Sequence, residues 1–104
     1  GDHPLMATLH LLSRSPFADT SGASCLRLLG PGDGLLLCGD AVYALQPGSQ
    51  PFEVLRALPA DRRLFALAED LQARGIAAPE FVHPLDYPGF VELTLRFERT
   101  NSWL

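Results

Sequence analysis

Residues 32–44, GDGLLLCGDAVYA, contain a short apolar run that is bounded on both sides by turn residues. The run, LLLC at residues 35–38, follows an Asp-Gly pair and precedes Gly39, as is typical of a strand that is buried on both faces of a sheet. Gly39 can adopt a positive φ where the chain leaves the sheet, and Asp40 can then cap a helix that begins at Ala41. The stretch therefore predicts a strand, a tight turn and a helix in direct succession.

The segments on either side of this unit repeat the alternation of strand and helix. Strands are indicated by apolar runs that end at turn residues, and Pro84 restricts the last of these runs to a sheet edge or a strand end. Between the runs, apolar residues recur at helical spacing, and an Asp70–Arg74 ion pair one turn apart supports a helix that Gly75 ends. We predict strands at residues 7–12, 35–38, 63–68 and 81–85, and helices at 41–45, 52–58, 69–74 and from a cap at Ser21 or Ser24 to Leu29.

The segment 87–97 has two competing patterns. In its second half apolar residues alternate with polar ones, as in a half-exposed strand, but several apolar residues also fall on one face of a helix. Asp86 followed by Pro88 is typical of a helix start, because a proline in the first turn lacks only an N–H that the helix does not use. We choose the helix, keep the strand as the alternative, and expect a short last strand at residues 100–104.

This order of elements predicts a three-layer α/β/α fold. Strands that alternate with helices are joined by right-handed crossovers, which give a mostly parallel sheet, here of roughly four to five strands, with helices on both faces. A chain of 104 residues is long enough for one such domain and too short for two. We assign the domain to residues 6–104, with Met6 as the natural start and residues 1–5 as an added remnant or a disordered leader.

The composition excludes several classes of function. Eight basic residues against twelve acidic ones leave a net charge of −4. Because this charge repels a phosphate backbone, the chain is not expected to bind nucleic acid directly. It contains no lysine and neither a G-x-G-x-x-G nor a P-loop motif, which disfavours nucleotide binding. No apolar run approaches the roughly 18 residues of a membrane span, and no signal peptide is visible, so we expect a cytoplasmic protein without a membrane contact.

A site in an open parallel sheet is expected at the carboxyl ends of the strands. The residues predicted at these strand ends are mostly acidic, and they include no phosphate-binding loop. Asp40 is interpreted as a helix cap in preference to a general base. The predicted strand-end surface consists of Arg14, Asp40, Glu69, Asp70, Asp86 and Tyr87.

The two cysteines are too few for a disulfide framework and are expected as free thiols. Cys25 lies near the start of a helix, where the helix dipole could lower its pKa and make it a sulfur acceptor. The alternative, which we favour, places Cys25 with Leu28 and Leu29 in a core stripe. Cys38 is expected as a buried, inert thiol. The three histidines show no metal spacing, so neither a metal nor a cofactor is expected, and His10 is interpreted as a structural core residue.

Six segments, in this order, resemble the TusB/DsrH family. Any one of them is short, but their order along the chain is specific, and the match runs from Met6 to the end. The segments are LHLLSRSPF (9–17), CLRLL (25–29), GDAVYA (39–44), EDLQARG (69–75), DYPGFVELT (86–94) and the terminal SW (102–103).

The resemblance implies a small α/β subunit of a sulfur-relay complex. In that family TusB, TusC and TusD have related folds and assemble as a dimer of heterotrimers, which passes persulfide sulfur from TusA toward TusE for 2-thiolation of the wobble uridine of certain tRNAs. In sulfur-oxidising bacteria the related DsrE, DsrF and DsrH subunits serve sulfur oxidation instead. The main persulfide-carrying cysteine belongs to the TusD/DsrE subunit, but some DsrH-like members have a cysteine at the position of Cys25, so a carrier role for Cys25 stays open.

The sequence leaves three functional hypotheses. The first is an accessory, non-catalytic subunit that binds TusC-like and TusD-like partners, with Phe90 and Trp103 as the candidate interface because aromatic side chains are enriched in interface cores. The second makes Cys25 a persulfide carrier in a DsrH-like sulfur-oxidation complex. The third is a stand-alone α/β domain that binds a small molecule.

Overall fold

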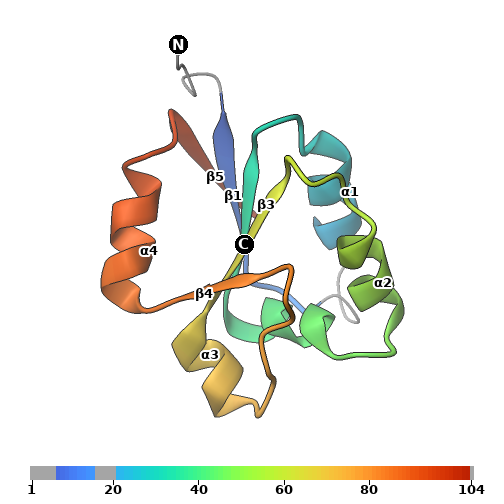
Figure 1. The fold of residues 1–104 in the computed structure, drawn as a ribbon. Coiled ribbons are helices and arrows are strands. Elements are labelled where there is room, and N and C mark those ends of the chain that lie inside the picture. Colours follow the sequence, from blue (N-terminus) through green and yellow to red (C-terminus); the bar gives the residue numbers. More distant parts are fainter. Residues whose placement is uncertain (1–6, 16–20, 104) are drawn as a thin grey trace.

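The computed structural model describes residues 7–15 and 21–103 of the chain, without the side chains of residues 21–23. Within these residues a five-stranded sheet is flanked by helices on two sides (Figure 1). The expected leader at residues 1–5 and Leu104, the end of the expected last strand, lie outside the described residues. The strands are β1 (Thr8–Leu12), β2 (Gly34–Leu37), β3 (Arg63–Leu67), β4 (His83–Leu85) and β5 (Arg99–Trp103), and the helices are α1 (Ser21–Leu28), the 3₁₀ helix η2 (Gly39–Leu45), α2 (Gln50–Arg56), α3 (Ala68–Ala73) and α4 (Tyr87–Thr94).

All strand pairings are parallel, and the strand order is β4-β3-β2-β1-β5. β2 is the central strand, so that Leu36 pairs with Leu11 of β1 on one side and with Phe65 of β3 on the other. All four residues of β2 are buried. The predicted α/β fold with a mostly parallel sheet, and the buried strand within it, are both confirmed.

The two edge strands agree with the predictions. β4 lies at one edge of the sheet and contains Pro84, which a central strand would not accept. β5 lies at the other edge, next to β1, so the last strand predicted at residues 100–104 is confirmed as far as Trp103.

Side chains of β2 alternate between two separate apolar cores. Leu35 and Leu37 join the larger core, to which α1, η2, α2 and α3 all contribute. Leu36 joins the second core together with Leu93 and Phe97. Figure 1 shows α4 on one side of the sheet and α1 and α2 on the other. The chain therefore forms three layers, and in the part that the structure describes one outer layer consists of α4 alone.

The segment after β4 forms the predicted helix and not the alternative strand. α4 begins after Asp86, whose side chain accepts a hydrogen bond from the N–H of Gly89 at 2.8 Å, and Pro88 occupies its first turn. Leu93 and Phe97 are buried in the second core. The cap and the proline thus give this segment its local preference, and the core contacts hold the helix against the sheet.

The turn after β2 differs from the prediction in one respect. Gly39 has the expected positive φ, 53°, but the helix that follows is of 3₁₀ type and begins at Gly39 itself. Cys38 occupies the capping position without a side-chain hydrogen bond, so the predicted cap at Asp40 is wrong. Asp40 lies in the first turn, and its carboxylate instead accepts a hydrogen bond from Arg74 at the end of α3.

α1 also differs from the predicted core stripe. It begins at Ser21, so Ser24 lies inside the helix, and the residue before Ser21 lies outside the described residues. Cys25 and Leu29 are buried as expected, but Leu28 is 61% exposed. Leu28 is the last residue of α1 and Leu29 lies just after it, and the rotation of the helix about its axis turns Leu28 outward while Cys25 faces the core.

Gly34 lies where a larger residue would not fit. A Cβ at this position would lie 2.7 Å from Cζ of Phe97 and 3.1 Å from Cδ1 of Leu9. We therefore expect Gly34→Ala to lower the free energy of unfolding by about 1–3 kcal/mol, the range for overpacked cores, as measured by urea unfolding. Gly30→Ala is the matched control, because its Cβ would meet no atom closer than 3.6 Å. Equal losses of stability in the two variants would contradict this explanation.

Candidate functional site

At the carboxyl edge of the sheet, Asp40 and Asp70 both contact Arg74. Arg74 donates hydrogen bonds from Nε and Nη2 to Oδ1 of Asp40, at 3.2 and 2.9 Å, and its Nη1 lies 3.7 Å from Oδ1 of Asp70. The hydrogen bond to Asp40 is the main cause that raises the pKa of Arg74, so the guanidinium stays charged. The predicted Asp70–Arg74 pair is confirmed. The contact between Arg74 and Asp40 joins residues 34 positions apart, and no local sequence signal indicates it.

Asp70 and Arg74 also hold the turn that follows β2. Oδ2 of Asp70 accepts the N–H of Gly39 at 2.8 Å, and the guanidinium of Arg74 lies 5.8 Å from the centroid of the Tyr43 ring. Tyr43 and Gly39 belong to η2, whereas Asp70 and Arg74 belong to α3 and its C-cap. Asp70 and Arg74 therefore tie η2 to α3.

Of the remaining predicted strand-end residues, Glu69 lies beside Asp70 after β3, and the others lie after β1 and β4. Asp86 and Tyr87 follow β4, where Asp86 caps α4 and the ring centroid of Tyr87 lies 5.7 Å from that of Phe90. Glu69 is exposed in the first turn of α3, and Arg14 is exposed after β1. The predicted surface is therefore spread along the carboxyl edge and does not converge on one point.

Cys25 is fully buried in the second turn of α1 and packs in the larger core. Burial raises the pKa of its thiol to about 12, because a thiolate is poorly solvated there. The alternative in which the helix start lowers this pKa is therefore wrong, because desolvation raises it. The favoured prediction of a buried core cysteine is confirmed.

Cys38 directly follows β2 and is half-buried, so the prediction of a fully buried thiol is corrected. Its Sγ donates a weak hydrogen bond to the carbonyl of Leu12 at 3.6 Å. Burial, and then the negative charge of Asp70, raise its pKa. Cys25 and Cys38 are therefore both protonated near neutral pH, and a protonated thiol is a weak nucleophile.

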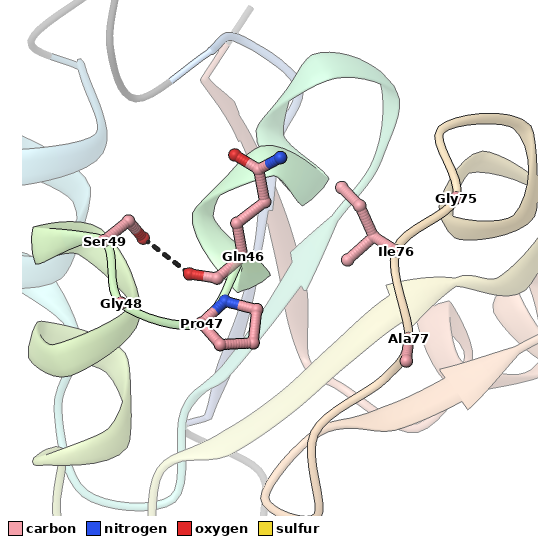
Figure 2. A pocket seen from close by; sticks show the side chains of 7 residues that line it. All are labelled: Gln46, Pro47, Gly48, Ser49, Gly75, Ile76 and Ala77. Carbon is pink, nitrogen blue, oxygen red and sulfur yellow. Dashed lines mark hydrogen bonds between the residues drawn. The ribbon is translucent and has the colours of Figure 1, made fainter.

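A hollow of about 590 Å³ lies between the turn that joins η2 to α2 and the segment after α3 (Figure 2). Its walls come from residues 46–49 on one side and 75–77 on the other. The hydroxyl of Ser49 donates to the carbonyl of Gln46 at 2.8 Å, and Ile76 points across the gap toward Gln46. Because its lining has no titratable or thiol group, the hollow offers shape but no catalytic chemistry.

Two further kinds of site are absent from the part of the chain that the structure describes. No group of three or more His, Cys, Asp or Glu side chains there could hold a metal ion. None of the helices described is long and apolar enough to cross a membrane.

Most of the chain matches one known protein family. The family described as DsrH like protein matches residues 14–100. This chain belongs to the DsrH-like family. Two relatives of this DsrH-like chain, both named Protein TusB, come from Escherichia coli O1:K1 / APEC and from Shigella boydii serotype 18. Each is 42% identical over 97 residues, which cover 91% of this chain and 99% of the relative, so the resemblance drawn from six short segments is confirmed.

A solved structure agrees with the fold of this DsrH-like chain. The crystal structure of the ychN protein from E. coli is similar with a TM-score of 0.73 and covers 94% of this chain and 100% of its own. The two sequences are 21% identical, so the likeness shows the fold alone.

The reactivity of the two thiols tests the burial and the raised pKa values of Cys25 and Cys38. We expect Cys25 not to react with iodoacetamide until the protein unfolds, and Cys38 to react only as the pH rises above the usual range for cysteine. Because the charge of Asp70 raises the pKa of Cys38, Asp70→Asn should shift the pH midpoint of Cys38 alkylation downward. Mass spectrometry of the Cys25→Ala protein measures this midpoint.

Asp40→Asn is the control for the charge of Asp70. It removes a neighbouring carboxylate that does not contribute to the raised pKa of Cys38, so the alkylation midpoint should stay unchanged. An equal shift in both variants, or an upward shift in Asp70→Asn, would contradict the assignment.

Proposed function

We propose that this DsrH-like chain is an accessory subunit of a TusBCD-like sulfur-relay complex, which passes persulfide sulfur for 2-thiolation of the wobble uridine of tRNA. The observation that carries the proposal is the 42% identity to curated TusB proteins over 99% of their length. Membership of this family supports a role in that pathway, with TusC-like and TusD-like subunits as partners. Relay proteins of the TusA and TusE type would act through the assembled complex.

The state of the two thiols supports an accessory role. A sulfur acceptor needs a thiolate that a persulfide donor can reach. Cys25 has no exposed surface and a pKa of about 12. Cys38 is partly accessible, but burial and Asp70 raise its pKa as well. We infer that a cysteine of a partner subunit carries the persulfide, and that this chain stabilises the assembly.

The charge of the chain supports an indirect relation to tRNA. A net charge of −4 repels a phosphate backbone, so the RNA would be bound by another component of the relay. The proposed pathway places the protein in the cytoplasm, where reducing conditions keep thiols free.

α4 offers a surface for a partner subunit. Tyr87 and Val91 of α4 and its C-cap residue Leu95 are spaced four residues apart and are 56%, 49% and 79% exposed. We call these three residues the α4 stripe. Exposed apolar patches of this kind mark protein–protein interfaces, and an i, i+4 row is a ridge that packs into the groove of another helix. Figure 1 shows α4 on one side of the sheet, opposite α1 and α2.

The aromatic residues that the sequence indicates as an interface, Phe90 and Trp103, are both half-buried. Phe90 packs on the second core and against Tyr87, next to the α4 stripe. Trp103 donates a hydrogen bond to His10 and packs on the larger core. Each therefore supports the fold of this chain, and we propose their exposed parts as additional contacts, with Phe90 continuous with the α4 stripe.

Co-expression with TusC-like and TusD-like subunits tests the proposed function. We expect a stable complex that elutes together in size-exclusion chromatography. A chain that stays alone beside both partners would overturn the proposed function.

Charge substitutions test the α4 stripe within that complex. Leu95→Glu should raise the dissociation constant at least about tenfold, because it places a charge against an apolar partner surface. Leu28→Glu is the matched control, since Leu28 is also apolar and 61% exposed but belongs to α1 on the other side of the sheet. Calorimetric titration of both variants measures the effect. If the two changes weaken binding equally, the α4 stripe is not the interface. That result would contradict the proposed interface but not the proposed complex.

The alternative function, a persulfide carrier in a DsrH-like sulfur-oxidation complex, depends on Cys25. We expect no mass gain of one sulfur atom on Cys25 when the folded protein is incubated with a persulfide donor, because its thiol is buried and protonated. Peptide mass spectrometry locates any adduct, with Cys25→Ser as the control. A sulfur adduct that Cys25→Ser abolishes would favour the alternative.

A further inference from the structure

Three polar side chains form a line of contacts from β5 through β1 to the turn before β2. Nε1 of Trp103 donates a hydrogen bond to Nδ1 of His10 at 3.1 Å, between residues 93 positions apart. On the other side of the imidazole, Nε2 lies 3.6 Å from Oδ2 of Asp33. His10 is 4% exposed and Asp33 is 9% exposed, so these contacts are shielded from water.

The hydrogen bond from Trp103 fixes the tautomer of His10. An indole N–H can only donate, so Nδ1 acts as the acceptor and carries no proton. The neutral ring therefore has its hydrogen on Nε2, on the side of Asp33. This N–H has no hydrogen-bond partner among the described residues, and a buried, unsatisfied donor destabilises the neutral state.

Asp33 is held in place by two backbone groups. Its Oδ1 accepts the N–H of Thr8 and its Oδ2 accepts the N–H of Gly30, both at 2.9 Å. The carboxylate thus joins the start of β1 and the end of α1 to the turn before β2. It gives a fixed acceptor that a positively charged His10 would face.

Among the side chains that the structure describes, the elements packed against His10 carry few charged groups. β2 has no titratable side chain. α1, which packs on β1 and β5, contributes the neutral Cys25 thiol and the exposed Arg27, and the described side chains of this helix include no other titratable group. β5 contributes Arg99, which is also exposed. Within the described residues, Asp33 is the carboxylate that lies against the ring of His10.

We propose that protonation of His10 releases Trp103 and so loosens the end of the last strand, β5, from β1. We call this contact between His10 and Trp103 the latch. When Nδ1 takes up a proton from solvent, both ring nitrogens become donors, and the indole N–H of Trp103 loses its acceptor. The imidazolium is then held by Asp33, while Trp103 is released. β5 is an edge strand whose residues before Trp103 are all exposed, so this release loosens its carboxyl end from β1. The latch changes the surface at that end of the sheet without unfolding the domain.

Trp103 is the only tryptophan of the chain and reports directly on the latch. With His3 and His83 replaced by glutamine, His10 is the only histidine left. When the pH is lowered from about 8 to about 5, we expect the emission of Trp103 to shift to longer wavelength in a one-proton transition. The exchange rate of the indole N–H, measured by NMR and divided by the rate of free tryptophan at the same pH, should rise about fivefold or more, as for the loss of an ordinary hydrogen bond.

His10→Gln in the same background should abolish the transition. A glutamine side chain can still accept the hydrogen bond of Trp103 but does not titrate in this range. Far-ultraviolet circular dichroism should stay constant while the emission shifts, which distinguishes release of Trp103 from unfolding.

Three outcomes would each overturn the latch: constant Trp103 emission across the range, a transition that survives His10→Gln, or a shift that coincides with loss of the dichroism signal. If His10→Gln fails to fold, the exchange of the indole N–H in the protein that retains His10 becomes the deciding measurement. An exchange rate that, relative to free tryptophan, is the same at high and low pH would overturn the proposal.

Discussion

The burial of β2 on both faces is the constraint on which the rest of the structure depends. A strand of this kind is stable only when helices cover both sides of the sheet, and its side chains accordingly contribute to two cores. α4 satisfies this need on the second side with only eight residues. Because a single short helix has an inner and an outer face, the α4 stripe is left toward solvent. The proposed interface is therefore a direct result of how the centre of the sheet is covered.

The carboxyl edge of the sheet, where a parallel α/β protein usually builds its chemistry, serves mainly to hold elements together here. Asp70 and Arg74 join α3 to η2, and Asp86 begins α4. The thiol at this edge, Cys38, is kept protonated by burial and by Asp70. Asp70 and Asp86 each accept a backbone N–H group, so both carboxylates have structural contacts at this edge.

The features that could be predicted from the sequence are those set by neighbouring residues. The apolar run of β2, the positive φ of Gly39 and the start of α4 at Asp86 all follow from local preferences. The errors concern contacts between distant residues. The carboxylate of Asp40 was available as a cap, but Arg74, brought close by the parallel pairing of β2 and β3, binds it instead.

The same distinction explains the candidate site and the latch. The burial of Cys25, and with it the raised pKa, depends on packing of α1 against the sheet, which no motif around the cysteine specifies. His10 could be recognised as a core residue, but its link to Trp103 requires β5 to return beside β1 from the far end of the chain. The exposure of Leu28 could not be predicted from helical spacing alone. A residue three positions after a buried one can face the core or the solvent, depending on how the helix is rotated about its axis.

Pro84 in the edge strand β4 has a consequence for how molecules of this kind can associate. Its nitrogen has no hydrogen to donate, so a strand from another molecule could not continue the sheet there in a regular ladder. At the opposite margin, β5 presents Arg99 and a row of polar side chains to water, which discourages the same kind of strand addition. Growth into an open-ended cross-β array is thus disfavoured at both margins.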